Sequence, residues 1–247
     1  MTLLIKTNNS ARAGATKRVL PVIDGLQYLM LADAADDPGH NWALGKRDGT
    51  VFGTPVRGPD GISWRFKGLT NYVQSETWEV DSETHFCIAR TFDLLNSDAT
   101  RPAFFGTFAG RPVKQDTTTT TFGSRFYIST AGAVRYSAGR GNTVTDDIQA
   151  DAAITVSNHQ AYQLYVLKTD PINTTRSATT NLSATNASVL PRFPARNRYR
   201  IGSAYSTTGG ECDILAYAKY DGALTDTQIN AVVADLRGYC ANLGVVV

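Results

Sequence analysis

Long hydrophobic runs, cysteine and an excess of charge of one sign are all scarce in this sequence of 247 residues. Apolar runs such as Leu3–Ile5 and Val245–Val247 are far shorter than the ~20 residues that a membrane-spanning helix needs. A secretory signal places basic residues before its apolar stretch, whereas here Lys6 and Arg12 follow Leu3–Ile5. We therefore expect no membrane insertion and no export, and a protein that is made in a cytosol.

The three cysteines indicate neither a disulfide framework nor a metal site. Cys87, Cys212 and Cys240 are an odd number, lie far apart and lack the spacing of metal ligands. We expect buried free thiols, no bound metal ion and no cofactor.

Charge is nearly balanced, with 24 basic and 22 acidic residues and a formal net charge of +2. The basic residues are clustered, and such clusters can bind acidic partners, so a nucleic-acid partner stays a minor hypothesis. One basic stretch lies near the C-terminal end, and it contains Arg192, Arg196, Arg198 and Arg200. We interpret this stretch as one solvated face of a strand, because exposed faces are usually charged.

The first residues differ from the rest of the chain in being polar, basic and without periodicity. Residues 6–18 carry four cations and no anion. We predict an extended basic N-terminal arm at residues 1–20, followed by a single domain at residues 21–247. An arm of this kind is ordered only by contacts with other structure. The residues expected to contact an assembly partner are Lys6, Arg12, Lys17 and Arg18.

From Val22 onward, short apolar runs alternate with clusters of Gly, Pro, Asp and Asn, which is typical of many short strands. A length of 247 residues is compatible with one large all-β domain. The expected strands are Leu26–Leu31, Ile62–Phe66, Phe86–Thr91, Phe104–Phe108, Arg125–Ser129, Ala133–Ser137, Tyr162–Lys168, Tyr199–Ser203 and Ile214–Tyr220. The run Tyr162–Lys168 is apolar at both parities, which predicts a central strand covered on both faces.

One helix is predicted near the C-terminus. Thr225-Asp226-Thr227-Gln228 has the form of a capping box, and apolar residues follow it at helical spacing from Ile229 to Cys240. We expect this helix to run to about Asn242, with Gly244 as its stop signal.

Two segments resemble the laminin-G-like and concanavalin A-like lectin/glucanase jelly rolls. Asp60–Val73 is similar to an early segment of that family, and Ala216–Ile229 is similar to its last strand and the start of a short C-terminal helix. The resemblance covers about residues 22–243 and implies an all-β, two-sheet antiparallel jelly-roll sandwich with one short C-terminal α-helix. In this family the ligands are often sugars, but the same sandwich also hosts hydrolases and structural modules.

Aromatic side chains suit sugar binding because flat amphipathic rings stack on sugar rings. We expect Trp64 and Tyr217 to pack in the core. Trp42 and Trp78 lie in polar, turn-rich surroundings and are expected to form an exposed platform. The candidate glycan-binding residues are Trp42, Trp78, Tyr72 and Tyr205.

One pattern points to catalysis instead. Glu79, Asp81 and Glu83 would share one face of a strand and line one groove, as a retaining glycosidase requires. The pattern resembles the E-x-D-x-E signature of laminarinases and lichenases, which implies that Glu79 is the nucleophile, Asp81 the helper and Glu83 the acid/base. The laminin-G register, however, places the motif in the loop before the Phe86 strand, and we expect no enzyme.

The resemblance and the arm together favour a non-enzymatic bacteriophage virion structural protein: a tail, fibre or capsid-decoration component. Laminin-G-like domains made in a cytosol without an export signal resemble those on phage virions. The expected partners are other virion proteins, copies of itself and host surface glycans, and the expected location is the virion, assembled in host cytoplasm. The alternatives are a β-glucan hydrolase that uses Glu79, Asp81 and Glu83, and a free-standing carbohydrate-binding lectin.

Overall fold

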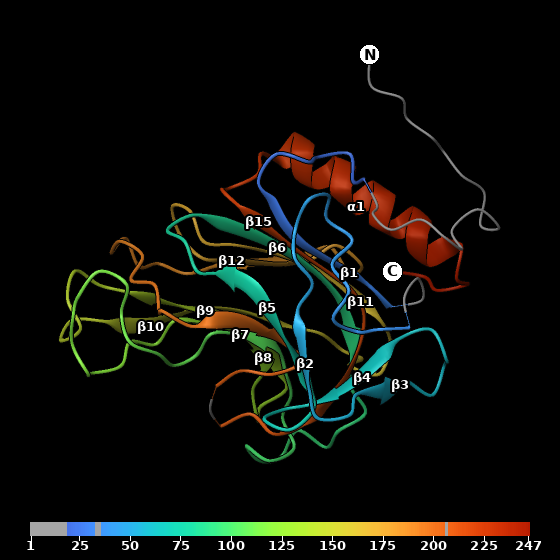
Figure 1. Cartoon of the computed structure of the whole chain (residues 1–247), viewed down its shortest axis with the longest axis horizontal. Helices are drawn as coiled ribbons and strands as arrows, with labels where there is room; N and C mark the ends of the chain where they lie inside the picture. Colours follow the sequence, from blue (N-terminus) through green and yellow to red (C-terminus); the bar gives the residue numbers. More distant parts are fainter. Residues whose placement is uncertain (1–18, 33–35, 206) are drawn as a thin grey trace.

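The computed structural model describes residues 19–32, 36–205 and 207–247. Within these residues the chain forms two antiparallel sheets and one α-helix, and the sheets face each other (Figure 1). In this part of the chain, no helix combines the length and the apolar character that crossing a bilayer requires. The predicted arm residues Lys6, Arg12, Lys17 and Arg18 lie outside the described residues. Leu20, at the end of the predicted arm, is buried in the core.

The first sheet has eight strands in the order β13-β12-β11-β6-β15-β4-β3, and β1 also pairs with β15. Its strands are β1 (Leu26–Leu31), β3 (Val56–Arg57), β4 (Trp64–Lys67), β6 (Glu83–Arg90), β11 (Gln163–Lys168), β12 (Thr174–Ser177), β13 (Leu182–Thr185) and β15 (Glu211–Asp221). As predicted, β11 is a central strand: it pairs with β6 on one side and β12 on the other. The C-terminal helix lies along the outer side of this sheet, near β1 and β15 (Figure 1).

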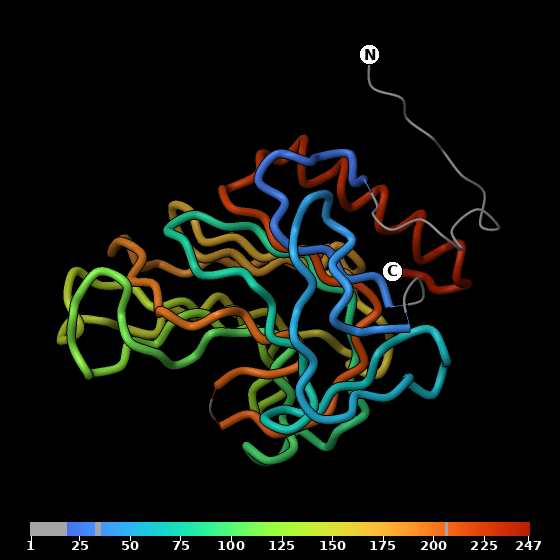
Figure 2. Tube along the Cα trace, in the orientation of Figure 1, coloured from blue at the N-terminus to red at the C-terminus, as the bar shows by residue number. Residues whose placement is uncertain are grey.

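The second sheet has seven strands in the order β10-β9-β8-β7-β14-β5-β2. Its strands are β2 (Thr50–Phe52), β5 (Tyr72–Trp78), β7 (Ala103–Gly106), β8 (Ser124–Ile128), β9 (Ala133–Arg140), β10 (Ile148–Thr155) and β14 (Arg198–Ile201). β2 lies beside β5 in the chain trace (Figure 2), and Thr50 of β2 is paired with Gln74 of β5.

Aromatic side chains fill the space between the two sheets. The ring of Phe105 on β7 lies 4.9 Å from Tyr217 on β15 and 4.7 Å from His85 on β6, centroid to centroid. Trp64 and Tyr217 are buried, as predicted. The three cysteines are free and buried, which confirms the expectation for them.

The predicted fold class and helix are confirmed. The helix α1 spans Asp226–Ala241, and Thr225 is its N-cap with a complete capping box to Gln228. Gly244 adopts a φ of +74°, the left-handed conformation that favours glycine after a helix. Each of the nine predicted strands corresponds to an observed strand: β1 has the predicted bounds, and the other eight differ at one end or both. The strands β2, β3, β5, β10, β12 and β13 were not predicted.

Candidate functional site

Four charged side chains are buried together between the sheets: Glu79, Glu83, Arg192 and Lys219. Nη2 of Arg192 lies 3.4 Å from a carboxylate oxygen of Glu79 and 3.4 Å from one of Glu83. Nζ of Lys219 lies 3.7 Å from Oε2 of Glu83. Arg192 was expected on a solvated face, and that expectation is wrong because this guanidinium neutralises two buried carboxylates.

Glu79 follows the last residue of β5, and protein donors surround its carboxylate. The backbone N–H of Ala195 donates to its Oε2 at 2.7 Å, and the hydroxyl of Thr107 and the N–H of Ser124 donate to its Oε1. Burial raises the pKa of Glu79, and Arg192 offsets only part of that effect.

Glu83 is the first residue of β6, and its pKa shifts in the opposite direction to that of Glu79. Burial alone would raise the pKa of Glu83, but His85, whose Nε2 lies 3.6 Å from the carboxylate, and the charges of Lys219 and Arg192 lower that pKa to about 2. The hydroxyl of Tyr199 also donates to its carboxylate. The two buried carboxylates therefore differ in pKa because their cation sets differ.

Asp81 does not join these two carboxylates. β5 ends at Trp78 and β6 begins at Glu83, so residues 79–82 connect two strands in different sheets. Asp81 is exposed and lies 2.7 Å from Nζ of Lys114. The alternative in which Glu79, Asp81 and Glu83 share one strand face and line one groove is therefore wrong, and Glu79 and Asp81 lie before the Phe86 strand, as the laminin-G register predicted. Among the described residues, no group of three or more His, Cys, Asp or Glu is placed to hold a metal ion.

A row of polar and aromatic side chains lies on the outer face of the seven-stranded sheet. Side chains alternate along β5, so Val73 and Ser75 are buried while Gln74, Glu76 and Trp78 are more accessible. Arg198 on β14 pairs with Trp78, and its Nη1 lies 2.7 Å from Oε1 of Glu76. The sequence showed this face only as the alternating polarity of residues 198–201.

Trp78 is the accessible aromatic side chain of this row. Its side chain is 48% exposed, as predicted, and the Arg198 guanidinium lies 5.2 Å from the ring centroid. The buried cluster anchors its backbone, because Nζ of Lys219 donates to the Trp78 carbonyl at 3.0 Å. The charged core therefore positions the end of β5 that presents Trp78.

The other predicted platform residues are less accessible. Trp42 is only 5% exposed, so the expectation that it forms an exposed platform is wrong. The backbone N–H of Trp42 donates to the carbonyl of Leu29 on β1 at 2.8 Å, which holds residue 42 against the sheet. The polar sequence around Trp42 could not reveal this long-range bond.

Tyr72 and Tyr205 flank Arg200 at the other end of the row. Tyr72 is buried and stacks on Phe52 with a centroid distance of 4.9 Å, while Arg200 lies 4.4 Å from its ring. Arg200 also lies 3.6 Å from the ring of Tyr205, whose hydroxyl donates to the Arg198 carbonyl at 2.9 Å. Both rings are thus largely occupied by protein contacts, which leaves Trp78 as the accessible ring.

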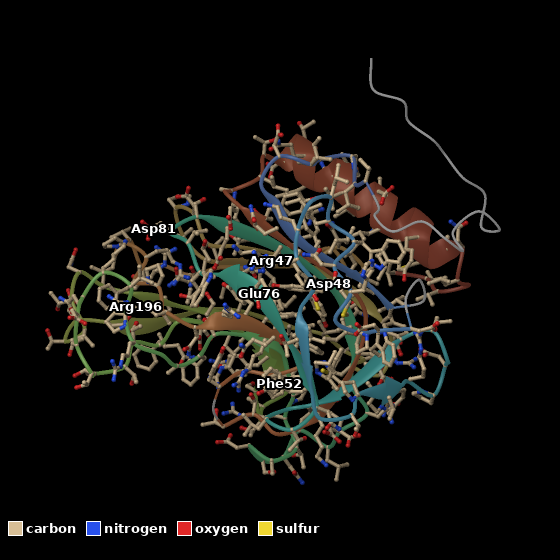
Figure 3. The ribbon with its side chains drawn as sticks, in the orientation of Figure 1. Arg47, Asp48, Phe52, Glu76, Asp81 and Arg196 are labelled. Carbon is tan, nitrogen blue, oxygen red and sulfur yellow. The ribbon has the colours of Figure 1, made fainter. Side chains whose placement is uncertain are left out.

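An open pocket of about 300 Å³ lies beside Glu76, at the edge of β5. The residues that line it are Gln27, Gly45, Lys46, Arg47, Glu76 and Thr77. Figure 3 shows Arg47 and Glu76 close together, with Phe52 farther along the molecule and Asp81 and Arg196 toward the opposite end. No sequence pattern indicated this pocket, because its lining comes from β1, the segment before β2, and β5.

No protein-family model matches the chain, and no curated protein matches it by sequence. Solved structures do match it in shape. The binding domain of botulinum neurotoxin DC in complex with SialylT has a TM-score of 0.56 and 10% identity, over 87% of this chain and 52% of that one. The receptor binding domain of botulinum neurotoxin mosaic serotype C/D has a TM-score of 0.61 and 9% identity, over 87% and 52% of the two chains.

A third match is a Trypanosoma rangeli sialidase in complex with sialic acid, with a TM-score of 0.58 and 14% identity, over 89% of this chain and 34% of that one. The chain thus spans about half the length of the toxin domains and about a third of the sialidase. These matches establish the fold, a concanavalin A-like lectin/glucanase β-sandwich.

Proposed function

We propose that this domain binds carbohydrate without transforming it, on the outer face of the seven-stranded sheet around Trp78. The observation that carries the proposal is the exposed indole of Trp78 beside the Glu76–Arg198 ion pair. Two of the structures with the same fold were determined with SialylT or sialic acid, which agrees with a sugar ligand.

The chemistry of the row matches that of a sugar. A sugar ring has an apolar face that stacks on a flat amphipathic ring such as indole. Its hydroxyls can donate to the Glu76 carboxylate and accept from the Arg198 guanidinium, and hydrogen bonds to charged groups are the stronger kind. Trp78, Glu76 and Arg198 lie on one face of two paired strands, so a single sugar can reach all three.

The non-catalytic part of the proposal rests on Glu79 and Glu83. Both carboxylates lie between the sheets, where Thr107, Ser124, Ala195 and Tyr199 already donate to them. A retaining glycosidase needs two carboxylates that flank a bound sugar. The test of this part is incubation with a panel of β-glucans, in which we expect no cleavage; cleavage that is lost in Glu79→Gln would contradict it.

Substitution of Trp78 tests the binding site. In Trp78→Ala we expect at least about tenfold weaker glycan binding, because the stacking surface is lost, with an unchanged melting temperature. Phe92→Ala is the matched control, because Phe92 is 47% exposed but follows β6 in the other sheet. Equal glycan affinity in Trp78→Ala and the wild type would refute the site.

We propose, more narrowly, that the domain is a virion component assembled in host cytoplasm. The support is the resemblance of the sequence and the basic stretch at residues 6–18. Because Leu20 is buried in the core, the truncated chain used in the test should start at residue 19 and lack residues 1–18. We expect the full chain to assemble with copies of itself and the truncated chain to be monomeric by analytical ultracentrifugation. Monomers in both cases would favour the free-standing lectin.

A further inference from the structure

The pocket beside Glu76 lies where β5 extends beyond its pairing with β2. Residues Thr50–Phe52 of β2 pair with residues Tyr72–Gln74 of β5. β5 continues beyond this pairing to Trp78. The chain before β2 turns away at Gly45, whose φ is +72°. The gap between this segment and the end of β5 is the 300 Å³ pocket. That volume is at the small end of the range for ligand sites and fits one sugar-sized group.

Positive charge dominates the pocket. Lys46 and Arg47 line it with a single carboxylate, Glu76, and Arg198 already neutralises that carboxylate at 2.7 Å. Nζ of Lys46 donates to Oε1 of Gln27 at 2.9 Å, which fixes the ammonium at the pocket wall. Arg47 is exposed, and its guanidinium has no ion pair with the described residues.

Asp48, the next residue, does not cancel this charge. It is not part of the lining, and its Oδ1 accepts from the N–H of Asn41 at 2.8 Å and lies 3.2 Å from Nδ1 of His40. The lining of the pocket therefore holds two cations, Lys46 and Arg47, and one carboxylate, Glu76, which is paired with Arg198. Such a site favours an anion, and the planar guanidinium of Arg47 is suited to bind a carboxylate through two parallel hydrogen bonds.

We propose that this pocket binds the carboxylate of an acidic sugar, while a neighbouring sugar of the same oligosaccharide stacks on Trp78. The inference rests on the proposed carbohydrate binding and names the ligand class. Glu76 in the pocket wall and Trp78 are two residues apart on one strand face, hence about 7 Å apart, so adjoining sugars can occupy both positions. Arg47 is the residue that selects the acidic ligand.

The test compares Arg47→Gln with the wild type on sialylated, uronate-containing, sulfated and neutral oligosaccharides of matched length. Binding is measured by calorimetry at two salt concentrations. We expect the wild type to prefer one of the two carboxylated ligands, and that preference identifies which of them is the ligand. In Arg47→Gln we expect about tenfold weaker binding of that ligand, with neutral-ligand binding unchanged. Added salt should weaken acidic binding in the wild type.

Arg196→Gln is the control, because Arg196 is also an exposed arginine but lies at the other end of the molecule (Figure 3). Its affinities should equal those of the wild type. Unchanged acidic binding in Arg47→Gln, or sulfated ligands bound as tightly as carboxylated ones, would overturn the inference. If neutral oligosaccharides bind through Trp78 and acidic ones bind no more tightly, the acidic-sugar inference is overturned but the proposed carbohydrate binding is not. Absence of binding to every ligand would overturn the proposed carbohydrate binding as well.

Discussion

At the scale of single residues, the four buried charges form one network of ion pairs, which Asp221 joins through Lys219. The sequence revealed Glu79 and Glu83 as a pattern, but their meaning depends on Arg192, which lies 109 residues from Glu83 along the chain. No local spacing encodes a contact of that range, so the pattern suggested a catalytic groove where the fold places ion pairs. Lys219 was equally hidden, within a strand predicted as apolar.

Removal of one carboxylate from this network should be costly. We expect Glu83→Gln to lower the free energy of unfolding by about 3 kcal/mol, because the buried cations Arg192 and Lys219 then keep only Glu79 and Asp221, respectively, as anionic partners. Asp81→Asn breaks only the exposed pair with Lys114 and should cost at most about 1 kcal/mol. Urea titrations of both variants measure these costs. A cost for Glu83→Gln no larger than that for Asp81→Asn would contradict the account of the network.

The same network predicts how stability depends on pH. The pKa of Glu83 falls from its ordinary value of 4.5 to about 2 on folding, since the nearby cations outweigh the effect of burial. Its contribution is therefore present above pH 4.5 and is lost as the pH falls toward 2. The raised pKa of Glu79 acts in the opposite direction, so its contribution is lost as the pH rises.

We expect unfolding free energies measured between pH 5 and 2 to decline, and to decline less in Glu83→Gln. Parallel curves for the variant and the wild type would show that Glu83 does not carry this dependence.

At the scale of elements, strands that are buried on both faces were easier to predict from the sequence than strands with one solvent-exposed face. β11 and β15 were found because burial on both faces leaves an uninterrupted apolar run. β5 was missed because Gln74, Ser75, Glu76 and Thr77 dilute its apolar pattern. That strand carries the candidate site, so the element on which the proposed function rests had little signal in the sequence.

The helix, in contrast, was predicted with its cap because capping is local. We expect Thr225→Ala to lower the free energy of unfolding by about 1 kcal/mol, because the N–H of Gln228 loses its acceptor at the helix start. Thr227→Ala, an exposed threonine within the same helix turn, is the matched control and should be neutral or slightly stabilising. Equal effects in thermal unfolding would mean that the cap contributes nothing.

At the scale of the whole molecule, two end motifs predicted a sandwich that is shared with proteins of only 9–14% identity. Such a fold tolerates this divergence because apolar alternation and total core volume specify it more than exact residues do. The site was not predictable to the same degree. Trp78 was predicted as exposed, but Lys46, Arg47 and Arg198 come together only through strand pairing and a diverging loop.

The measurement that tests the central claim most directly is a titration of a ¹⁵N-labelled chain with an oligosaccharide, monitored at the indole N–H signals. The chain has 3 tryptophans, and only Trp78 is exposed, while Trp42 and Trp64 are buried. The account predicts that the signal of Trp78, assigned through Trp78→Ala, shifts with the sugar while the other two stay in place. A stationary Trp78 signal, or shifts confined to Trp42 or Trp64, would contradict it.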